Sequence, residues 1–206
     1  ATFIIGSTAF IHLLLGRLWA TITMIAVNLS AGLITVYLWD HFLRQYQKDR
    51  IMTFLDPESD RLGSGWNIIQ SKIAIGSGGL TGKGFLGGTQ TKYEFLPAAH
   101  TDFIFSVIGE ELGFVGALVV LALFFFLITR ALQIGAMVKN RFYSLIAIGL
   151  ASILTFHVFV NIGMTIGVMP VTGLPLPFLS SGGSSLLSNL VAIGLLLHIY
   201  TYRHEY

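Results

Sequence analysis

The sequence contains no cysteine and few charged residues. The absence of cysteine excludes a disulfide framework of the kind that stabilises small secreted proteins. Only 11% of the 206 residues are charged, against about 25% in a typical soluble domain, and 54% are hydrophobic. The formal net charge of +2 is too small to indicate a nucleic-acid partner. With a mean hydropathy of +0.77, the chain has the composition of a membrane protein.

Four hydrophobic runs are long enough to cross a bilayer, which requires roughly 20 mostly apolar residues in a helix. They are residues 18–39, 112–137, 143–168 and 186–202. A fifth run, residues 1–16, is shorter and lacks the Met and the basic flank of a signal peptide. We therefore expect an all-α polytopic membrane protein with about five transmembrane helices in this chain. We interpret residue 1 as a cut inside a longer membrane protein.

Basic residues in the short connections indicate the orientation, because Lys and Arg favour the cytoplasmic side. These connections carry Arg17, Lys139, Arg141 and Arg203. The resulting topology places a long segment, residues 40–111, and the loop 169–185 outside. The long segment has basic residues of its own, namely Arg44, Lys48, Arg50 and Lys72, but long loops count little in this rule.

The topology implies one membrane domain over residues 1–206. Two transmembrane segments, residues 1–39, precede the outer segment 40–111, which we expect to form a large loop and a re-entry helix. Three further transmembrane segments occupy residues 112–206, and the outer loop 169–185 lies among them.

The outer segment contains a glycine-rich stretch, GSGGLTGKGFLGGTQ, at residues 76–90. It is not a Walker phosphate loop, because Ser77 and Gly84 stand where that motif requires Gly and Ser or Thr. Gly82, Gly84 and Gly87 match G-x-G-x-x-G, but no βαβ unit surrounds them. Two alternatives remain. The stretch is a tight loop that needs positive φ angles, or a backbone that closely approaches a bulky polar ligand.

A second polar interruption, MPVTGLPLPFLSSGGSS at residues 169–185, holds three of the five prolines and cannot form a regular helix. Irregular backbone at membrane depth is tolerated only when it is buried in protein or lines a wet cavity. The segment is therefore either a turn that only connects helices or a cavity wall. In the second case it would offer the hydroxyls of Ser180, Ser181, Ser184 and Ser185.

Polar and small residues within the hydrophobic runs suggest packing roles. Asn161 and Asn189 indicate either a polar interior or hydrogen bonds that hold helices together. His157 and His198 stand alone, so we expect interhelical hydrogen bonds and not a metal pair. The G-x-x-x-G spacings predict close helix packing at Gly109/Gly113 and at Gly163/Gly167.

The stretch HTDFIF predicts that Asp102 lies in the first turn of an apolar helix. It either complements the helix dipole or acts as a base or cation ligand at an outward cavity. On one unbroken helix, Glu110 and Glu111 point about 80° and about 180° away from Asp102, with an axial offset of roughly 12 Å. A paired acid and base on this helix is therefore disfavoured. A phosphate-type leaving group on a divalent cation would remove the need for a second carboxylate.

Three stretches resemble the RodA/FtsW family of shape, elongation, division and sporulation proteins. They are NIGMTIGVMPVTGLPLPFLSSGGSS, GWNIIQSKIAIGSGGLTGKGFLGGTQ and FLPAAHTDFIFSVIGEELG. The sequences GTQ at residues 88–90 and LDPESD at residues 55–60 look more like the RodA branch than FtsW. Ser181 departs from the Tyr usual in the family. The resemblance covers residues 40–206 and implies the C-terminal half of a ten-helix bundle.

The resemblance also implies a function. Members are bacterial inner-membrane glycan polymerases that join lipid II into peptidoglycan for cell-wall elongation and rod shape. They work beside a class B penicillin-binding protein and other membrane proteins of the elongation complex. By resemblance, Asp102 is the catalytic residue and a ligand for Mg²⁺ or Mn²⁺. The implied substrate-binding residues are Lys72, Ser77, Gly78, Gly79, Lys83, Thr89, Gln90, His100, Thr101, Ser180, Ser181, Gly182, Gly183 and Ser184.

Two other functions remain open from the sequence. Irregular backbone beside a cavity also suits a carrier that flips the lipid-linked precursor, and a non-catalytic scaffold of the wall-synthesis complex needs no base at all. A carrier would yield no glycan from lipid II, and a scaffold would tolerate a conservative change at Asp102. We expect the 206-residue chain by itself to be inactive, because half of the implied cavity is missing.

Overall fold

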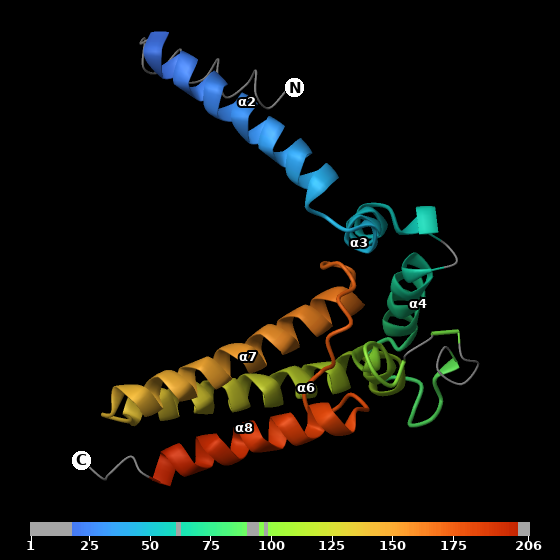
Figure 1. Ribbon diagram of the computed structural model, residues 1–206. Coiled ribbons are helices and arrows are strands. Elements are labelled where there is room, and N and C mark those ends of the chain that lie inside the picture. Colours follow the sequence, from blue (N-terminus) through green and yellow to red (C-terminus); the bar gives the residue numbers. More distant parts are fainter. Residues whose placement is uncertain (1–17, 61–62, 90–94, 97–98, 202–206) are drawn as a thin grey trace. The chain divides into compact units, whose positions relative to one another are not determined.

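The computed structural model describes residues 18–60, 63–89, 95–96 and 99–201, and this part of the chain is helical without strands (Figure 1). The expected span 1–16 and the basic residues Arg17 and Arg203 lie outside the described residues. The helices are α2 (Leu18–His41), α3 (Gln45–Leu55), η1 (Pro57–Asp60), α4 (Ser64–Ser77), α6 (Ile104–Met137), α7 (Arg141–Thr165) and α8 (Gly183–Thr201).

Four of the described helices are long and apolar enough to cross a membrane. They lie at Ile22–His41, Ile104–Met137, Arg141–Thr165 and Gly183–Thr201. The chain is therefore a multi-pass, all-α membrane protein, and the expected fold class is confirmed. It divides into two compact units, residues 1–49 and residues 50–206.

The first unit is built around α2. Its polar side chains bond to carbonyls of the same helix: Thr23 to Trp19, Asn28 to Met24, Ser30 to Val27 and Thr35 to Ala31. Each of these bonds reaches back one turn, which satisfies the polar group without help from water. The helix is thereby compatible with lipid although it contains several hydroxyls.

The second unit packs α6, α7 and α8 side by side, with α4 against the start of α6 (Figure 1). Near the α6–α7 turn, Ala131, Ala147 and Ala151 are almost fully buried. Small residues of this kind let membrane helices approach closely. The turn from α6 to α7 is fixed by Asn140, whose Oδ1 accepts from the Phe142 N–H at 2.9 Å.

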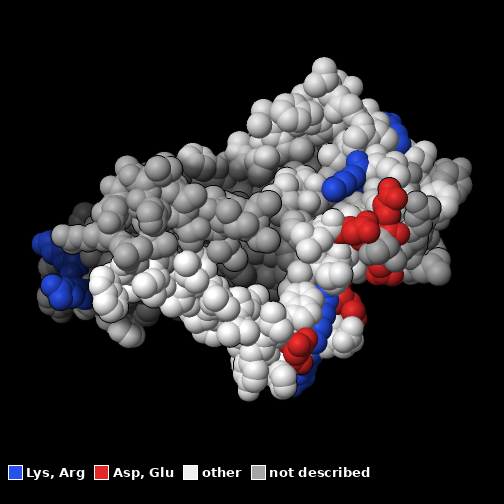
Figure 2. Space-filling model, turned by 90° about the horizontal axis from the view of Figure 1, so that it is seen from above, with Lys and Arg blue, Asp and Glu red and all other residues white. Residues whose placement is uncertain are grey.

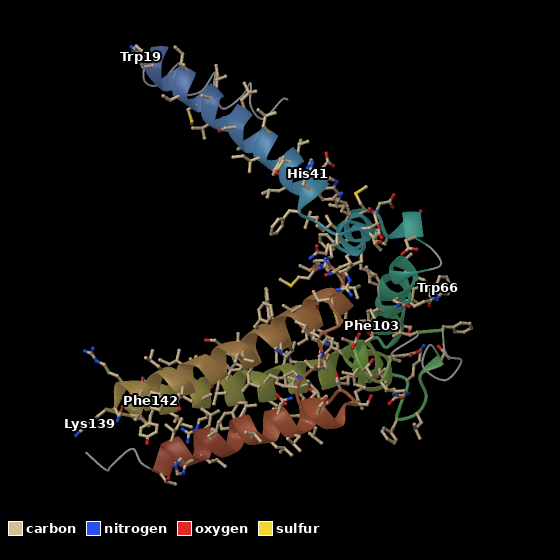
Figure 3. The ribbon with its side chains drawn as sticks, in the orientation of Figure 1. Trp19, His41, Trp66, Phe103, Lys139 and Phe142 are labelled. Atoms are coloured by element: carbon tan, nitrogen blue, oxygen red, sulfur yellow. The ribbon has the colours of Figure 1, made fainter. Side chains whose placement is uncertain are left out.

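The two ends of α6 differ in character. Figure 3 labels Lys139 where α6 turns into α7 and Phe103 at the opposite end of α6, and the space-filling view shows Lys and Arg side chains gathered at the α6–α7 end (Figure 2). Helix α7, with 25 residues, is about 37 Å long at 1.5 Å per residue. Helix α7 is therefore long enough to span the hydrocarbon core of a bilayer, which is about 30 Å thick.

The predicted run 112–137 begins at a break in the described helix Ile104–Met137, which has non-helical angles at Gly113, so a short helical segment precedes the run. One boundary of the next predicted run was wrong by a few residues. This run ends at Thr165 and not at 168. Gly167 has φ of 75°, its N–H bonds Met164 O, and the next N–H bonds Gly163 O. This is the Schellman pattern that ends helices, so Gly163 and Gly167 form a helix cap and not the helix contact that we predicted.

Helix α6 is interrupted at Gly113, whose φ of 66° and ψ of −163° are not helical. An intact helix would join each N–H to the carbonyl four residues before it. The break leaves two carbonyls and two N–H groups to find other partners, and the glycine-rich loop supplies them. The bonds are Lys83 N to Glu110 O (3.0 Å), Gly84 N to Glu111 O (3.0 Å), Phe114 N to Gly79 O (2.9 Å) and Val115 N to Leu80 O (3.1 Å).

Glycines make this close approach possible. A Cβ at Gly113 would overlap the backbone nitrogen of Gly82, and a Cβ at Gly78 would overlap the carbonyl of Gly109. Gly79, Gly82 and Gly84 have positive φ angles, which confirms the tight-loop alternative. The close packing predicted at Gly109 is also confirmed, since it lies against Ile75 of α4. Gly113 instead breaks its helix.

Candidate active site

The candidate site centres on the turn at residues 99–103, just before α6. Asp102 precedes the helix and its N-cap Phe103, so our placement of Asp102 in the first helical turn was wrong. The turn is held by apolar anchors: Phe103 is 2% exposed and packs with Leu96, Ala99 and Val107. Asp102 itself is half-buried. A short irregular turn, and not a helix, therefore presents the candidate catalytic carboxylate.

Three consecutive carbonyls of this turn accept hydrogen bonds from other segments. Ser181 donates both its N–H and its hydroxyl to the His100 carbonyl, each at 2.8 Å. The Ser180 hydroxyl donates to the Thr101 carbonyl at 2.5 Å. The Asn161 amide donates to the Asp102 carbonyl at 2.9 Å. The turn thus has no regular secondary structure, yet its backbone acceptors are satisfied.

Asn161 lies in α7 and is fully buried. Its second amide hydrogen reaches the Leu174 carbonyl at 2.7 Å, and its Oδ1 has no hydrogen-bond partner. Asn161 therefore joins the Asp102 turn to the proline-rich loop, residues 169–182 between α7 and α8. Of the two predicted roles, this agrees with a polar interior and not with a hydrogen bond between helices. Asn189, in contrast, bonds Ser185 of its own helix at 3.4 Å.

The carboxylate of Asp102 makes no hydrogen bond or ion pair with the described residues. It faces the proline-rich loop, where a Cβ at Gly173 would lie 3.4 Å from Oδ2. Gly173 has φ of 75°, so glycine serves both the backbone conformation and the space beside the carboxylate. Nearby, the Arg50 guanidinium donates to the Thr172 carbonyl at 3.2 Å. The site combines a fixed backbone with an available acidic group.

Unlike Asp102, Glu110 has hydrogen-bond partners for its carboxylate, which the sequence did not reveal. It is fully buried, and its Oε1 accepts from Lys83 Nζ at 2.7 Å, from the Thr89 N–H at 2.7 Å and from the Thr89 hydroxyl at 3.0 Å. The carboxylate therefore anchors the glycine-rich loop to α6. The only signal in the sequence was an acid inside an apolar helix, because buried carboxylates require partners.

The structure brings some of the predicted substrate-binding residues to this region and gives others structural bonds. Lys83 and Thr89 hold Glu110, and Ser180 and Ser181 hold the Asp102 turn. The Ser77 hydroxyl bonds Ala74 of its own helix at 2.8 Å. Gln90 lies outside the described residues.

The remaining predicted residues lie on exposed or half-buried surface, apart from Gly78 at the α6 contact. His100, Gly182, Gly183 and Ser184 are exposed, and Thr101 is half-buried. Lys72 is exposed on α4, and its Nζ would lie 2.5 Å from a Cβ at Gly167. We expected Gly183 and Ser184 to be part of an irregular loop, but they begin α8. Gly79 is exposed in the loop against α6.

The residues around Asp102 would bind a divalent cation only together with oxygen ligands from a bound substrate. Among the described residues, no group of three or more His, Asp and Glu side chains could hold a metal ion. Mg²⁺ is often bound through one or two carboxylates together with substrate phosphates. A single available carboxylate, Asp102, is consistent with that type of binding.

Fold and site define a polytopic membrane protein with a carboxylate in a backbone-anchored turn where a membrane-spanning helix begins. The chain belongs to the cell cycle protein family that comprises FtsW, RodA and SpoVE, whose family model matches residues 1–205. The family resemblance that we drew from the motifs is confirmed.

Relatives of known name share this similarity. The chain is 52% identical over 197 residues to the peptidoglycan glycosyltransferase MrdB of Escherichia coli K12, a match that covers 96% of this chain and 53% of that protein. It is 46% identical over 193 residues to the peptidoglycan glycosyltransferase RodA of Treponema pallidum, which covers 91% of this chain and 44% of the relative. The chain thus spans about half the length of these curated relatives.

Two solved structures are similar as well. One, titled as the structural coordination of polymerization and crosslinking by a peptidoglycan synthase complex, matches 99% of this chain and 56% of its own, with a TM-score of 0.66 and 36% identity. The other is a mutant of the rod shape determining protein RodA of Thermus thermophilus, with a TM-score of 0.51 and 40% identity over 65% of this chain and 40% of its own.

Proposed function

We propose that this chain is part of a peptidoglycan glycosyltransferase of the RodA branch, which polymerises lipid II into glycan strands with Asp102 as general base. The observation that carries the proposal is the anchored turn with its available carboxylate. The names of the relatives support the reaction class. The comparisons do not favour a carrier or a scaffold.

The reaction follows from the chemistry of the implied substrates. The 4-hydroxyl of an acceptor sugar attacks the anomeric carbon of a donor held through undecaprenyl pyrophosphate. Asp102 accepts the hydroxyl proton as the new C–O bond forms. The bond to the pyrophosphate breaks, and its electron pair leaves with the lipid-linked pyrophosphate. Inversion converts an α-linked donor into a β-linked glycan.

A second protein carboxylate is not required for this reaction, because pyrophosphate is a good leaving group. Bound Mg²⁺ or Mn²⁺ would supply neutralisation of the charge on the pyrophosphate. Asp102 is the described residue that would contribute to holding it. Glu110 has another task, since its charge is paired with Lys83 and its Oε1 also accepts from Thr89.

We propose a bacterial inner-membrane location with the Asp102 turn outside. Lys139 lies in the short α6–α7 turn and Arg141 begins α7, and basic residues at short connections favour the cytoplasmic side. The Asp102 turn lies at the opposite end of α6. The site therefore faces the side where wall precursors are polymerised.

We also propose a class B penicillin-binding protein as partner, with other membrane proteins of the elongation complex. The support is the similar solved structure, whose title describes polymerization and crosslinking by one synthase complex. The substrate-binding role of Lys72, His100, Thr101, Gly182, Gly183 and Ser184 remains a prediction, and so does that of the residues already engaged in structural bonds.

The proposed function is tested by Asp102→Asn in the full-length protein with labelled lipid II and Mg²⁺ or Mn²⁺. Asn keeps the size of the side chain but cannot take a proton, and loss of a general base typically costs about 10²–10⁴-fold. Asp102→Glu should retain a trace, because displacement near 1 Å costs on the order of 10²-fold. Near-normal polymer from Asp102→Asn would refute the proposed chemistry.

A further inference from the structure

We infer that Asn161 and Ser180, supported by Ser181, are positioning residues that set the position of Asp102 and the direction of its Cα–Cβ bond by holding the carbonyls of residues 100–102. The inference rests on the proposed function of Asp102. None of the three needs to touch the substrate. Their hydrogen bonds to the turn are its evidence.

The donors come from segments far away in the sequence. Ser180 and Ser181 end the proline-rich loop, and Asn161 lies near the end of α7. The sequence separations are 59 residues for Asn161 to Asp102 and 79 for Ser180 to Thr101. A turn without helical or sheet bonds has many conformations of similar energy. Fixing successive peptide groups from two sides leaves the residue at its end little freedom.

The Asn161 amide can be oriented in only one way. Nδ2 carries two hydrogens, and two carbonyl oxygens lie at hydrogen-bond distance from it. The reversed amide would direct Oδ1 at both oxygens with no hydrogen between them. The observed orientation leaves Oδ1 buried and unpaired, which is costly.

Ser180 forms a second constraint of the same kind. Its hydroxyl donates to the Thr101 carbonyl and accepts from the Leu176 N–H at 2.7 Å. Leu176 is fully buried, so the hydroxyl connects the turn to a buried point of the proline-rich loop. The same loop carries Gly173 beside the carboxylate. One segment therefore both orients the Asp102 turn and borders the space in front of Asp102.

The test uses the full-length protein with its transpeptidase partner and measures kcat and KM for labelled lipid II. Asn161→Leu keeps the approximate shape but removes both donors, and Ser180→Ala removes one hydroxyl. We expect kcat to fall about 10²-fold in each, as for a 1 Å misplacement of a catalytic group, with KM changed by less than about twofold. Ser180→Thr retains the hydroxyl and should regain most of the lost kcat.

Matched controls remove comparable groups elsewhere. Among the described residues, the Asn28 amide bonds Met24 of its own helix and no other residue, and the Ser152 hydroxyl bonds Ile148 and no other residue. Asn28→Leu and Ser152→Ala remove these groups. Both should retain wild-type kcat. If Asn161→Leu fails to fold, the comparison of Ser180→Ala with Ser180→Thr decides the question, because a serine hydroxyl is a small deletion.

The outcomes separate the inference from the proposed function. Wild-type kcat in Asn161→Leu and Ser180→Ala, with Asp102→Asn inactive, would overturn the positioning role and leave the base intact. A raised KM with unchanged kcat would overturn it too, because these residues would then bind substrate. Near-normal polymer from Asp102→Asn would refute the proposed function itself.

Discussion

Glu110→Gln should loosen the glycine-rich loop from α6 and lower the stability of the protein. The change removes the charge that Lys83 Nζ meets at 2.7 Å and weakens the two bonds from Thr89. The side chain of Glu110 is 0% exposed and that of Lys83 is 27% exposed. After the substitution, Lys83 can be partly hydrated, and Gln can still accept from the Thr89 N–H.

The expected loss follows from these exposures. Removing one partner of a fully buried pair costs about 3–5 kcal/mol, but the partial exposure of Lys83 lowers that figure. Hydrogen bonds to charged groups contribute about 1.5–3 kcal/mol, so we expect about 2 kcal/mol for Gln. The curated relatives are about twice as long as this chain, and for a protein of that length Tm changes by about 1–2 °C per kcal/mol, so Tm of the full-length variant should fall by about 2–4 °C.

The assay is thermal unfolding of the purified full-length protein, with Glu111→Gln as the matched control. Glu111 is only half-buried, and its side chain makes no bond with the described residues. The Tm of Glu111→Gln should therefore stay within about 1 °C of the wild type. The double variant Lys83→Met with Glu110→Gln should be more stable than Lys83→Met alone, which leaves a buried carboxylate without its cation.

Two results would refute this reasoning. Equal Tm values for Glu110→Gln and Glu111→Gln would show that the ion pair does not hold the loop. A double variant less stable than Lys83→Met would show that the two side chains are independent.

Three further predictions concern the fold, the orientation and the extent of the protein. Gly113→Ala should lower the free energy of unfolding by more than about 2 kcal/mol, because its Cβ would meet the backbone of Gly82. Gly149 has open space around it, so Gly149→Ala should be neutral or stabilising by up to about 1 kcal/mol. Thermal unfolding measures both. Single cysteines at Thr81 and Asn140, in a chain without native thiols, should react with impermeant labels from outside and from the cytoplasm respectively, and reversed labelling would overturn the orientation. The 206-residue chain by itself should form no glycan from lipid II, and detectable polymer would contradict the expectation that half of the cavity is missing.

Hydropathy determined most of what the sequence could establish. The described membrane-spanning helices overlap the predicted runs, because burial in hydrocarbon demands about 20 apolar residues irrespective of neighbours. The sequence also located both irregular loops, because proline and glycine restrict or free the backbone locally. The motif around Asp102 indicated the family because its residues are contiguous in the sequence, so that no tertiary contact is needed to detect it.

Tertiary structure decided what depends on contacts between distant segments. The break at Gly113 has low cost only because a loop some 30 residues earlier supplies the missing backbone partners. The burial of Glu110 is tolerable only because Lys83 reaches it. Neither condition is visible in a local pattern, since the same acid and the same glycine would fit an ordinary exposed helix.

The candidate site shows the same division. The family resemblance implied Asp102 as the catalytic residue and Ser180 and Ser181 as substrate-binding residues, and the sequence indicated no partner for the two hydroxyls, because a hydroxyl in a polar loop has many possible partners. Only the packing of the proline-rich loop against the Asp102 turn shows that these hydroxyls bond backbone carbonyls. Asn161 was equally ambiguous, and its two bonds exist because α7 ends beside both segments. A hydrogen bond depends on positions to within a few tenths of an ångström, and the fold alone fixes positions that closely.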